Sequence, residues 1–569
     1  MLSSKVKDGS LAVLKIVMAL FIVVAPTLLG FLSIELSACL LFLLMGLMYV
    51  ARVRKTGQGH MSVFQLGMLF LLAYSAISTL WVSNKSGHGI YMLIISSLIM
   101  FFGIVTEYFS ENNDEKAQRR MMYMLSLSGT VCALWNFIYW VVALLPFGKK
   151  EPFMQGLGNS DFLALYMILC VIVTYKLIRG NKQSRKVLFV ISILIMAFVF
   201  VMAGGIGWFF LAVFVVMYFS TRRTKKFFVP ITLAFSAIFL IVVLIAGNAA
   251  QQGSVFKDVF GYGMKNLVGC GGGFWSARQM FFSEKYTDAM VPGLFASLCA
   301  SSGIIGIACC VVIAGRVVLQ FVKLKTWVSA ANIFVTVMVL FMPFGQSLIP
   351  LFLWMGLVAY NEKDGNFSVE GKFNEKTVKY ITYIVALAGV FTVVLLCQTL
   401  MKSSALDKYN NEKYIEAYEL YNTAASINPT DGESCRMAAK SLYASDSITK
   451  RYSEAVSLVD KAVKRDRYNL ENTEIKAQIY YKCEMYDLSA KEYMVIASKV
   501  KDSGRYNLET VRSLYNIICT KEKGSADAKT LYEKMVVISE NTSDLDYKEK
   551  INNIIDKALV YTKGELAVE

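Results

Sequence analysis

The residues best suited to chemistry lie in one polar stretch, residues 248–290, of an otherwise apolar chain. This stretch contains the run Gly269-Cys270-Gly271-Gly272-Gly273. It also carries cations, which bind phosphate oxygens, and carboxylates, which can move protons. These charged residues are Lys257, Asp258, Lys265, Arg278, Glu284, Lys285 and Asp288. The stretch is therefore the first place to look for a functional site.

Shorter polar gaps elsewhere add a second group of candidate residues. They are Lys85, His88, Lys149, Lys150, Asn159 and Asp161. His88 is the only histidine in these polar gaps on the predicted outer side. Each group also has a structural interpretation. The lysines can extend to lipid headgroups, His88 can sit at the membrane interface, and the loop acids can be solvated. The glycine run can be a simple turn.

Apolar segments must position these residues. The chain has 569 residues, of which 56% are hydrophobic and 18% charged. Up to about Leu400 it is a series of apolar runs, each close to the roughly 20 residues that a helix needs to cross a bilayer. Hydropathy predicts about 12–13 transmembrane helices. The fold class is therefore all-α, with a polytopic membrane domain at 1–400 that includes the large loop 248–290, and a soluble domain at 401–569.

The basic residues predict the orientation of the membrane domain. Every even-numbered gap between the predicted spans is basic, and basic loops stay in the cytoplasm. The N-terminus is then cytoplasmic, and the first span is retained. The loop 248–290 and the C-terminal domain lie on the outer side. The net charge of +16 is mostly this topology signal, so we expect no nucleic-acid partner. Clear examples are Arg52, Arg54, Arg119, Arg120, Lys176, Arg222, Arg223, Arg316 and Lys323.

The C-terminal domain repeats a pattern of small and bulky residues. Small residues stand at positions 0 and 7 and a bulky one at position 4, and the pattern recurs after about 35 to 38 residues. This spacing predicts paired helices and resembles the tetratricopeptide repeat, whose concave face binds a protein or an extended polymer. The alternative is a helical domain without repeats. The pattern residues are Ala417, Tyr421, Ala424, Pro429, Ala455, Val459, Ala462, Arg467, Ala490, Met494, Ala497, Ala528, Tyr532 and Met535.

The cysteines give no sign of a metal site. Eleven are present, most of them inside apolar runs where cysteine acts as a small hydrophobic residue. The remaining ones have neither CxxC spacing nor histidine partners. We expect no metal and no other cofactor.

Four sequence blocks together resemble the O-antigen ligase and polymerase superfamily. The block 156–166 resembles the family's Gly-Asn-x-Asn-Phe helix opening, and 203–208 stands where its Ser-Arg-Gly-x-Trp turn lies. The block 267–274 resembles its Gly-x-Gly-x-x-Phe segment, and 300–306 its Glu-Thr-Gly-Leu-Ile-Gly helix. The glycines and asparagine that carry this likeness are Asn159, Gly269, Gly271, Gly273, Gly303 and Gly306.

The resemblance implies an enzyme of cell-surface polysaccharide synthesis in a bacterial cytoplasmic membrane. It would transfer or polymerise a polyprenyl-diphosphate-linked glycan at the outer face, and its partners would be the bilayer, that glycan and a protein or polymer bound by the tail. Pro292 and Gly293 stand at the family's His-Asn pair and Gly205 at an arginine. Asp288 and His88 are then the candidate bases. The candidate diphosphate-binding residues are Arg278, Lys285, Lys265, Lys257, Lys149 and Lys150.

Two other functions fit the sequence. The first is a catalytically inactive relative that serves as a membrane scaffold and binds glycan or a partner through its tail. The second is a transporter, which would need buried ionisable residues at mid-membrane. The predicted spans contain almost no such residues, which disfavours transport.

Overall fold

The structure is a computed structural model whose helices fall into two compact units. The first unit comprises residues 1–78, 90–269 and 289–396, and the second comprises 79–89, 270–288 and 397–569. The structure describes residues 20–27, 32–82, 84–111, 115–143, 157, 160–179, 183–203, 205, 207–209, 211–212, 215, 228–250, 255–272, 293–342, 347–364, 368–445, 448–500 and 503–563.

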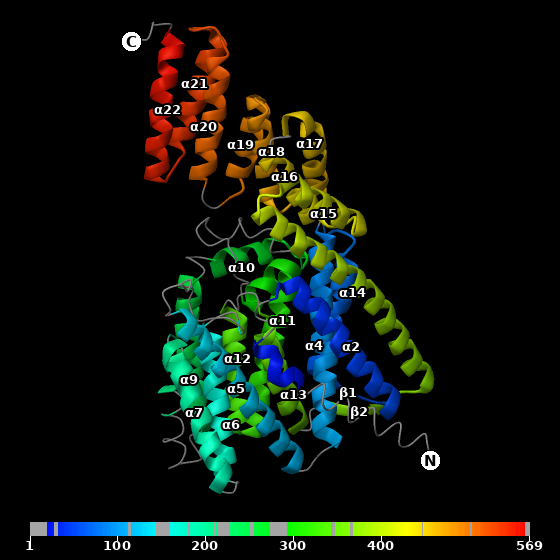
Figure 1. The fold of residues 1–569 in the computed structure, drawn as a ribbon. Coiled ribbons are helices and arrows are strands. Elements are labelled where there is room, and N and C mark those ends of the chain that lie inside the picture. Colours follow the sequence, from blue (N-terminus) through cyan, green and yellow to red (C-terminus); the bar gives the residue numbers. More distant parts are fainter. Residues whose placement is uncertain are drawn as a thin grey trace. The chain divides into compact units, whose positions relative to one another are not determined.

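The first unit is built from apolar helices (Figure 1). Eight described helices are long and apolar enough to cross a membrane, which fits a membrane protein. The sequence predicted about 12–13 spans. Some of the remaining predicted spans are shorter helices, and the one at 205–220 falls largely outside the described residues. The eight are Ile34–Thr56, Lys85–Thr106, Arg119–Val142, Ser160–Ile178, Lys186–Ala203, Phe228–Ile245, Leu294–Leu324 and Glu375–Asn410.

Neighbouring helices of this unit pack in small groups. Three consecutive helices, α5, α6 and α7, pack on one another, and α12 packs against α9, α11 and α13. The short α10 packs on α11 and lies across it (Figure 1). The bounds are α2 Ile34–Thr56, α3 Val63–Ser78, α4 Lys85–Glu111, α5 Glu115–Ala143, α6 Ser160–Arg179, α7 Gln183–Ala203, α9 Phe228–Ala250, α10 Val255–Lys265, α11 Leu294–Leu324, α12 Trp327–Phe341, α13 Ile349–Asp364 and α14 Glu375–Asn410.

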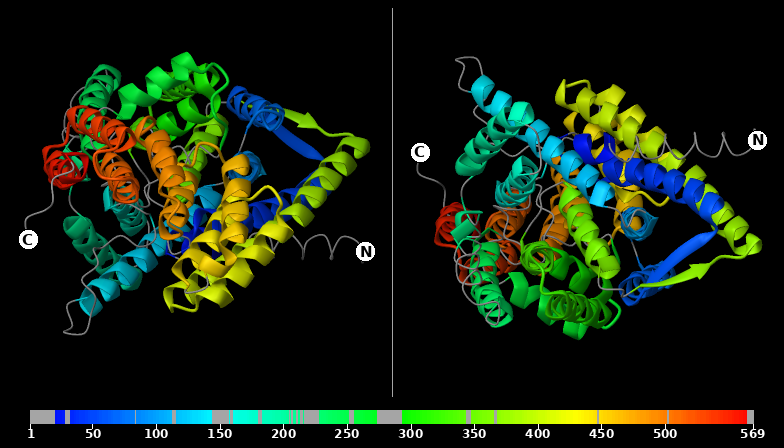
Figure 2. Two further views of the ribbon diagram at one scale, coloured as in Figure 1. Left: turned by 90° about the horizontal axis from the view of Figure 1, so that it is seen from above. Right: turned by 90° about the horizontal axis from the view of Figure 1, so that it is seen from below.

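One short ladder interrupts this helical fold. Strand β1 (Gln58–Ser62) pairs antiparallel with β2 (Ser368–Lys372), with Gly59 opposite Gly371. It follows α2, whose C-terminal Gly57 has a left-handed φ of 60°. Figure 2 shows the ladder at the edge of the unit, where β2 leads into α14. The ladder thus joins two segments more than 300 residues apart in sequence.

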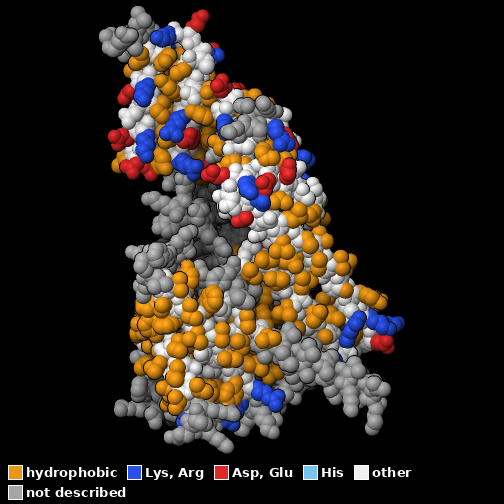
Figure 3. All heavy atoms as spheres, in the orientation of Figure 1, with side chains coloured by type: hydrophobic (Ala, Val, Ile, Leu, Met, Phe, Trp, Pro, Cys, Tyr) orange, Lys and Arg blue, Asp and Glu red, His pale blue; other side chains and the backbone are white. Residues whose placement is uncertain are grey.

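Apolar side chains also cover the outside of the first unit (Figure 3). On α14, Leu387 is 76% exposed, and Tyr383 and Val390 are nearly as exposed. Surface of this kind is unfavourable in water but matches lipid chains. The exposed faces therefore support the assignment of these helices to a bilayer.

The second unit is an array of antiparallel helices in which each packs on the next. The recurring small residues lie in its core: Ala417, Ala455 and Ala462 are fully buried, and Tyr421 is 3% exposed. Met494 differs, because its side chain is 42% exposed. The helices are the end of α14, α15 Tyr414–Ile427, α16 Gly432–Ala444, α17 Ile448–Arg465, α18 Leu470–Lys482, α19 Tyr486–Ala497, α20 Gly504–Cys519, α21 Ala526–Glu540 and α22 Leu545–Lys563.

Ion pairs connect alternate helices of this array. Arg436 of α16 pairs with Glu471 of α18, and Arg505 of α20 lies 2.7 Å from Glu474 of α18. Lys402, near the end of α14, pairs in the same way with Glu433 of α16. The helices are therefore held by charged pairs as well as by their apolar core.

Candidate functional site

In the first unit, the turn after α10 lies directly against α11. Gly269 donates a backbone hydrogen bond to the Asn266 carbonyl at 3.0 Å and has a φ of +63°. A Cβ atom at Gly269 would lie 2.4 Å from the Ser301 carbonyl oxygen. Only glycine meets both conditions, because other residues avoid this φ and carry a Cβ. The backbones of the turn and of α11 are therefore in direct contact.

The other side of this contact is a kink in α11 at Gly303. Its φ of 58° and ψ of −135° are not helical. A Cβ atom there would lie 2.1 Å from the Asn266 carbonyl oxygen, and one at Gly306 would lie 1.9 Å from that of Leu298. From the sequence alone, Gly303 and Gly306 could simply permit close packing of a neighbouring helix. Gly303 instead breaks the helix, and the turn occupies the space that a side chain would fill.

Small hydroxyl groups surround this junction. Ser301 and Ser302 are buried, their Oγ atoms are 3.4 Å apart, and they lie beside the buried Tyr91 hydroxyl. Tyr74 donates a hydrogen bond to the Val268 carbonyl at 2.9 Å. Among the described side chains of the junction no pair of nucleophile and base stands out. The junction is a scaffold that fixes the start of the glycine run.

A second glycine segment of the first unit follows α7 and packs against the first turns of α6. Gly205 has a φ of +65°, and a Cβ atom there would lie 2.4 Å from Oδ1 of Asp161. Gly207 approaches Ala164 in the same way, with its Cβ position 2.5 Å from the Ala164 Cβ. Asp161 lies in the first turn of α6, where the helix dipole stabilises a carboxylate. The turn therefore leaves no room for a long side chain at Gly205.

The second unit contains His88 and the middle of the glycine run. Nδ1 of His88, a residue only 1% exposed, accepts a hydrogen bond from the Gly272 backbone N–H at 2.8 Å. Gly271, with a φ of +84°, has its Cβ position 2.3 Å from Val82. Because Nδ1 accepts this bond, the ring proton is on Nε2. His88 thus anchors the glycine run to the segment 79–89, and its Nδ1 lone pair is already in use.

The same segment is hydrogen-bonded to the helical array within the second unit. Nδ2 of Asn84 donates to Oδ2 of Asp466 at 2.9 Å, and Nδ2 of Asn428 donates to Ser86 at 3.2 Å. Asn428 also donates to Gln398, which in turn donates to Asp431 at 2.6 Å. The sequence predicted that residues 83–88 are a short connection between two spans. The structure shows that the segment 79–89 is hydrogen-bonded to the helical array and is part of this unit.

The two lysines of the large loop that the structure describes lie on α10. Lys257 and Lys265 are exposed, as are Phe260 and Met264 of the same helix. Val259 on the opposite side is fully buried. The exposed side of α10 therefore carries both apolar side chains and two cations, and the cations are accessible to a ligand or a lipid headgroup.

The other predicted site residues lie outside the described part of the chain. Their arrangement relative to His88 or α10 is therefore not given by the structure. They are Asp288, Arg278, Lys285, Lys149, Lys150, Asn159 and Gly273. Within the residues that the structure describes, no cluster of three or more potential metal ligands occurs.

The first unit also contains a buried polar cluster that was not predicted from the sequence. Arg316 of α11 donates two hydrogen bonds, of 2.8 and 3.1 Å, to the fully buried carboxylate of Glu362 on α13. Gln320 donates to the same carboxylate at 2.7 Å. A buried charge is costly unless it is paired, and here the pairing is bidentate. The only sequence signal was a glutamate placed directly after a predicted span.

Comparisons with known proteins add no assignment. No protein-family model matches the chain, and no curated protein matches it significantly.

Proposed function

We propose that this chain is an O-antigen-ligase-like membrane protein that transfers or polymerises a polyprenyl-diphosphate-linked glycan at the outer face of a bacterial cytoplasmic membrane. The observation that carries the proposal is the pairing of the four sequence blocks. Gly269 packs on the kink at Gly303, and Gly205 packs on Asp161. The third and fourth blocks thus meet at a backbone contact that requires Gly269 and Gly303, two of the glycines by which they resemble the family. The second block meets the first where Gly205, at the family's arginine position, approaches the Asp161 side chain.

The chemistry requires a cationic site for the diphosphate and a base for the acceptor hydroxyl. Arginine and lysine stabilise the leaving diphosphate through contacts to its oxygens. We assign this role to Arg278, Lys285, Lys265 and Lys257 of the loop, with Lys149 and Lys150 from a neighbouring one. We assign the base to Asp288, since the hydrogen bond from Gly272 occupies Nδ1 of His88. His88 then acts by positioning the glycine run.

The tail, in this proposal, is an outward-facing tetratricopeptide-like domain that binds polymer or a partner protein. The buried alanines at the recurring positions support the repeat. So does Asn428, which begins the turn between α15 and α16 just before Pro429. Alternate helices of such repeats line one concave face, as expected for binding an extended chain.

A second candidate is a non-catalytic relative that binds the lipid-linked glycan without transferring it. One observation favours it. Gly293, which stands at the family's asparagine, caps α11, and a Cβ atom there would lie 2.4 Å from the Leu340 carbonyl oxygen. The backbone around this position is therefore built for glycine, and an asparagine side chain would not fit without movement.

A transfer assay separates the two candidates. The purified protein is incubated with a lipid-linked oligosaccharide and acceptor, and both product and bound glycan are measured. For an enzyme, Asp288→Asn should lower turnover about a hundredfold or more, as expected for loss of a general base. Arg278→Ala should lower it as well, whereas Lys323→Ala, at the far end of α11, should leave it unchanged. Unchanged rates in both site variants would refute the assigned site.

The same assay has a distinct outcome for the scaffold. Binding without product at every acceptor concentration supports the non-catalytic relative, and absence of both overturns the proposed function.

The orientation of the tail needs its own test. Cys519 of the tail is exposed and can serve as the labelling site. A membrane-impermeant maleimide should label Cys519 in spheroplasts whose cytoplasmic membrane is intact. Labelling only after lysis would place the tail in the cytoplasm.

A further inference from the structure

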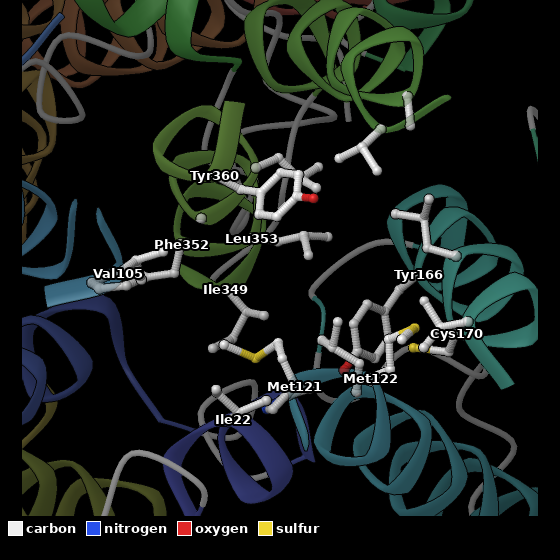
Figure 4. A pocket seen from close by; sticks show the side chains of 18 of the residues that line it. Ile22, Val105, Met121, Met122, Tyr166, Cys170, Ile349, Phe352, Leu353 and Tyr360 are labelled. Carbon is white, nitrogen blue, oxygen red and sulfur yellow. The ribbon is translucent and has the colours of Figure 1, made fainter. Parts of the chain in front are cut away.

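The first unit contains an apolar cavity of about 450 Å³. Figure 4 shows side chains of several helices around it, among them Val105 of α4, Met121 of α5, Cys170 of α6 and Phe352 of α13. Residues 20–27 and α12 complete the described lining. Nearly all of these side chains are hydrocarbon. Apolar cavities exclude water and bind apolar molecules, and a cavity left empty destabilises a fold in proportion to its volume.

The cavity is elongated along the helix axes. Lining residues recur on one face of α13 from Ile349 through Phe352 and Gly356 to Tyr360. These eleven steps correspond to a rise of about 16 Å. On α6 the lining runs from Tyr166 to Lys176, or about 15 Å. Half of a bilayer's hydrocarbon core is also about 15 Å thick. The cavity therefore has the length of one leaflet's lipid chain.

One end of the cavity is basic. Lys176, whose side chain is exposed, lines it in the last turns of α6. Met121 and Met122 line it at the start of their span, directly after the exposed Arg119 and Arg120. Figure 4 shows the hydroxyl of Tyr360 directed into the cavity. Basic pockets between membrane helices attract anionic lipid headgroups.

We propose that this cavity binds one acyl chain of an anionic glycerophospholipid, with the lipid phosphate at Lys176. The apolar lining, the length of one leaflet and the cations at a single end match the three parts of such a lipid. In the orientation that the basic loops predict, the lipid comes from the cytoplasmic leaflet. The site is thus separate from the outer loops to which the glycan is assigned, and it does not depend on the proposed function.

Photolabelling of the full chain tests this site. The protein is reconstituted in phosphatidylcholine nanodiscs that contain phosphatidylglycerol with a diazirine in one acyl chain. After irradiation, peptides are mapped by mass spectrometry, and label is expected on lining residues of α6 and α13. Gly356 lines the cavity, and a Cβ atom there would make an ordinary contact, 3.7 Å from Phe101, so we expect the side chain of Gly356→Leu to occupy the cavity. It should lower labelling of α6 about tenfold.

Matched variants separate the site from general effects. Gly315→Leu is the control for Gly356→Leu, since nothing lies within 4 Å of a Cβ atom at Gly315. Lys176→Gln should lower labelling by phosphatidylglycerol about fivefold. Lys323→Gln, which replaces an exposed lysine of α11, should not change it. Ala331→Leu, from α12, fills the same cavity independently and should repeat the effect of Gly356→Leu.

Three results would overturn the proposal. The first is equal labelling in Gly356→Leu, Ala331→Leu and the wild type. The second is an equal loss of labelling in Gly315→Leu. The third is displacement of the label by undecaprenyl phosphate but not by unlabelled phosphatidylglycerol, which would assign the cavity to an isoprenoid chain.

Discussion

The two units are both helical, but different contacts hold their helices together. In the first unit, helices meet at glycines, and large apolar side chains such as Leu387 face outward. In the second unit, alanines and larger apolar residues fill a core, and several ion pairs connect alternate helices, whereas the first unit has the buried pair of Arg316 and Glu362. Lipid chains are as apolar as a protein core, so moving an apolar side chain from lipid into the first unit gains little free energy. Close packing must then hold its helices together. In water, apolar burial is the main driving force.

The largest effect is expected at the kink of α11. Gly303→Ala should destabilise the first unit by about 3–5 kcal/mol, because it adds both backbone strain at a left-handed φ and overpacking. The new Cβ would lie 2.1 Å from the Asn266 carbonyl oxygen. Thermal unfolding of the full chain in detergent measures the loss.

Gly315→Ala is the matched control, because it lies in the same helix with open space around it. It should be neutral or slightly stabilising, since alanine has the higher helix propensity. Equal stability of the two variants would mean that the backbone contact does not hold these helices together.

A core residue of the second unit should show a somewhat smaller effect. Leu442→Ala should cost about 3 kcal/mol, because Leu442 is fully buried in the same core cluster as Cys435. Leu387→Ala, at a side chain 76% exposed on α14, should change stability by less than about 0.5 kcal/mol. The rate at which the buried Cys435 thiol reacts in increasing urea reports the opening of this core. A similar cost at both leucines would contradict the comparison.

The same contrast explains how much the sequence could predict. Hydropathy indicated membrane helices because each span carries its own signal in a window of about 20 residues. The spacing of Ala455, Val459 and Ala462 likewise predicted burial, and all three side chains are fully buried. Met494, at the bulky position of a later repeat, is exposed. Ala528 and Met535 of the last repeat are buried again, so the spacing fails at Met494 and not throughout the C-terminal repeats.

The remaining features had no local signal. Asn84 and Asp466 are 382 residues apart in sequence, so nothing near either one indicates their hydrogen bond. The pair of Arg316 and Glu362 depends on how α11 packs near α13. The kink at Gly303 was ambiguous, because two glycines three residues apart suit close helix packing equally well. Predicting these contacts requires the tertiary fold.

Cross-helix ion pairs should have a smaller effect than the core. Arg436→Ala should cost about 1–2 kcal/mol, since it removes an ion pair whose two side chains are only 13% and 21% exposed. Replacing Lys379, whose pair with Glu375 is exposed on both sides, should have no measurable effect. A double-mutant cycle with Glu471→Ala isolates the pair. A coupling energy of zero would show that this ion pair adds nothing to the stability of the contact between α16 and α18.

The smallest expected effect is a pH dependence at Glu454 of the second unit. The Tyr418 hydroxyl and the Arg451 guanidinium both donate hydrogen bonds to this carboxylate and lower its pKa from the usual 4.5. A lowered pKa in the folded state means that the carboxylate stabilises the fold above its unfolded pKa. This stabilisation is lost as the pH falls through the lowered value. Because Glu454 is 39% exposed, solvent screening limits the effect to a few tenths of a kcal/mol.

Glu454→Gln should therefore flatten the fall in the melting temperature of this unit below about pH 4.5. Glu540→Gln, a change in another helix of the same unit, is the control, and an identical slope in both variants would rule out Glu454 as a source of the pH dependence.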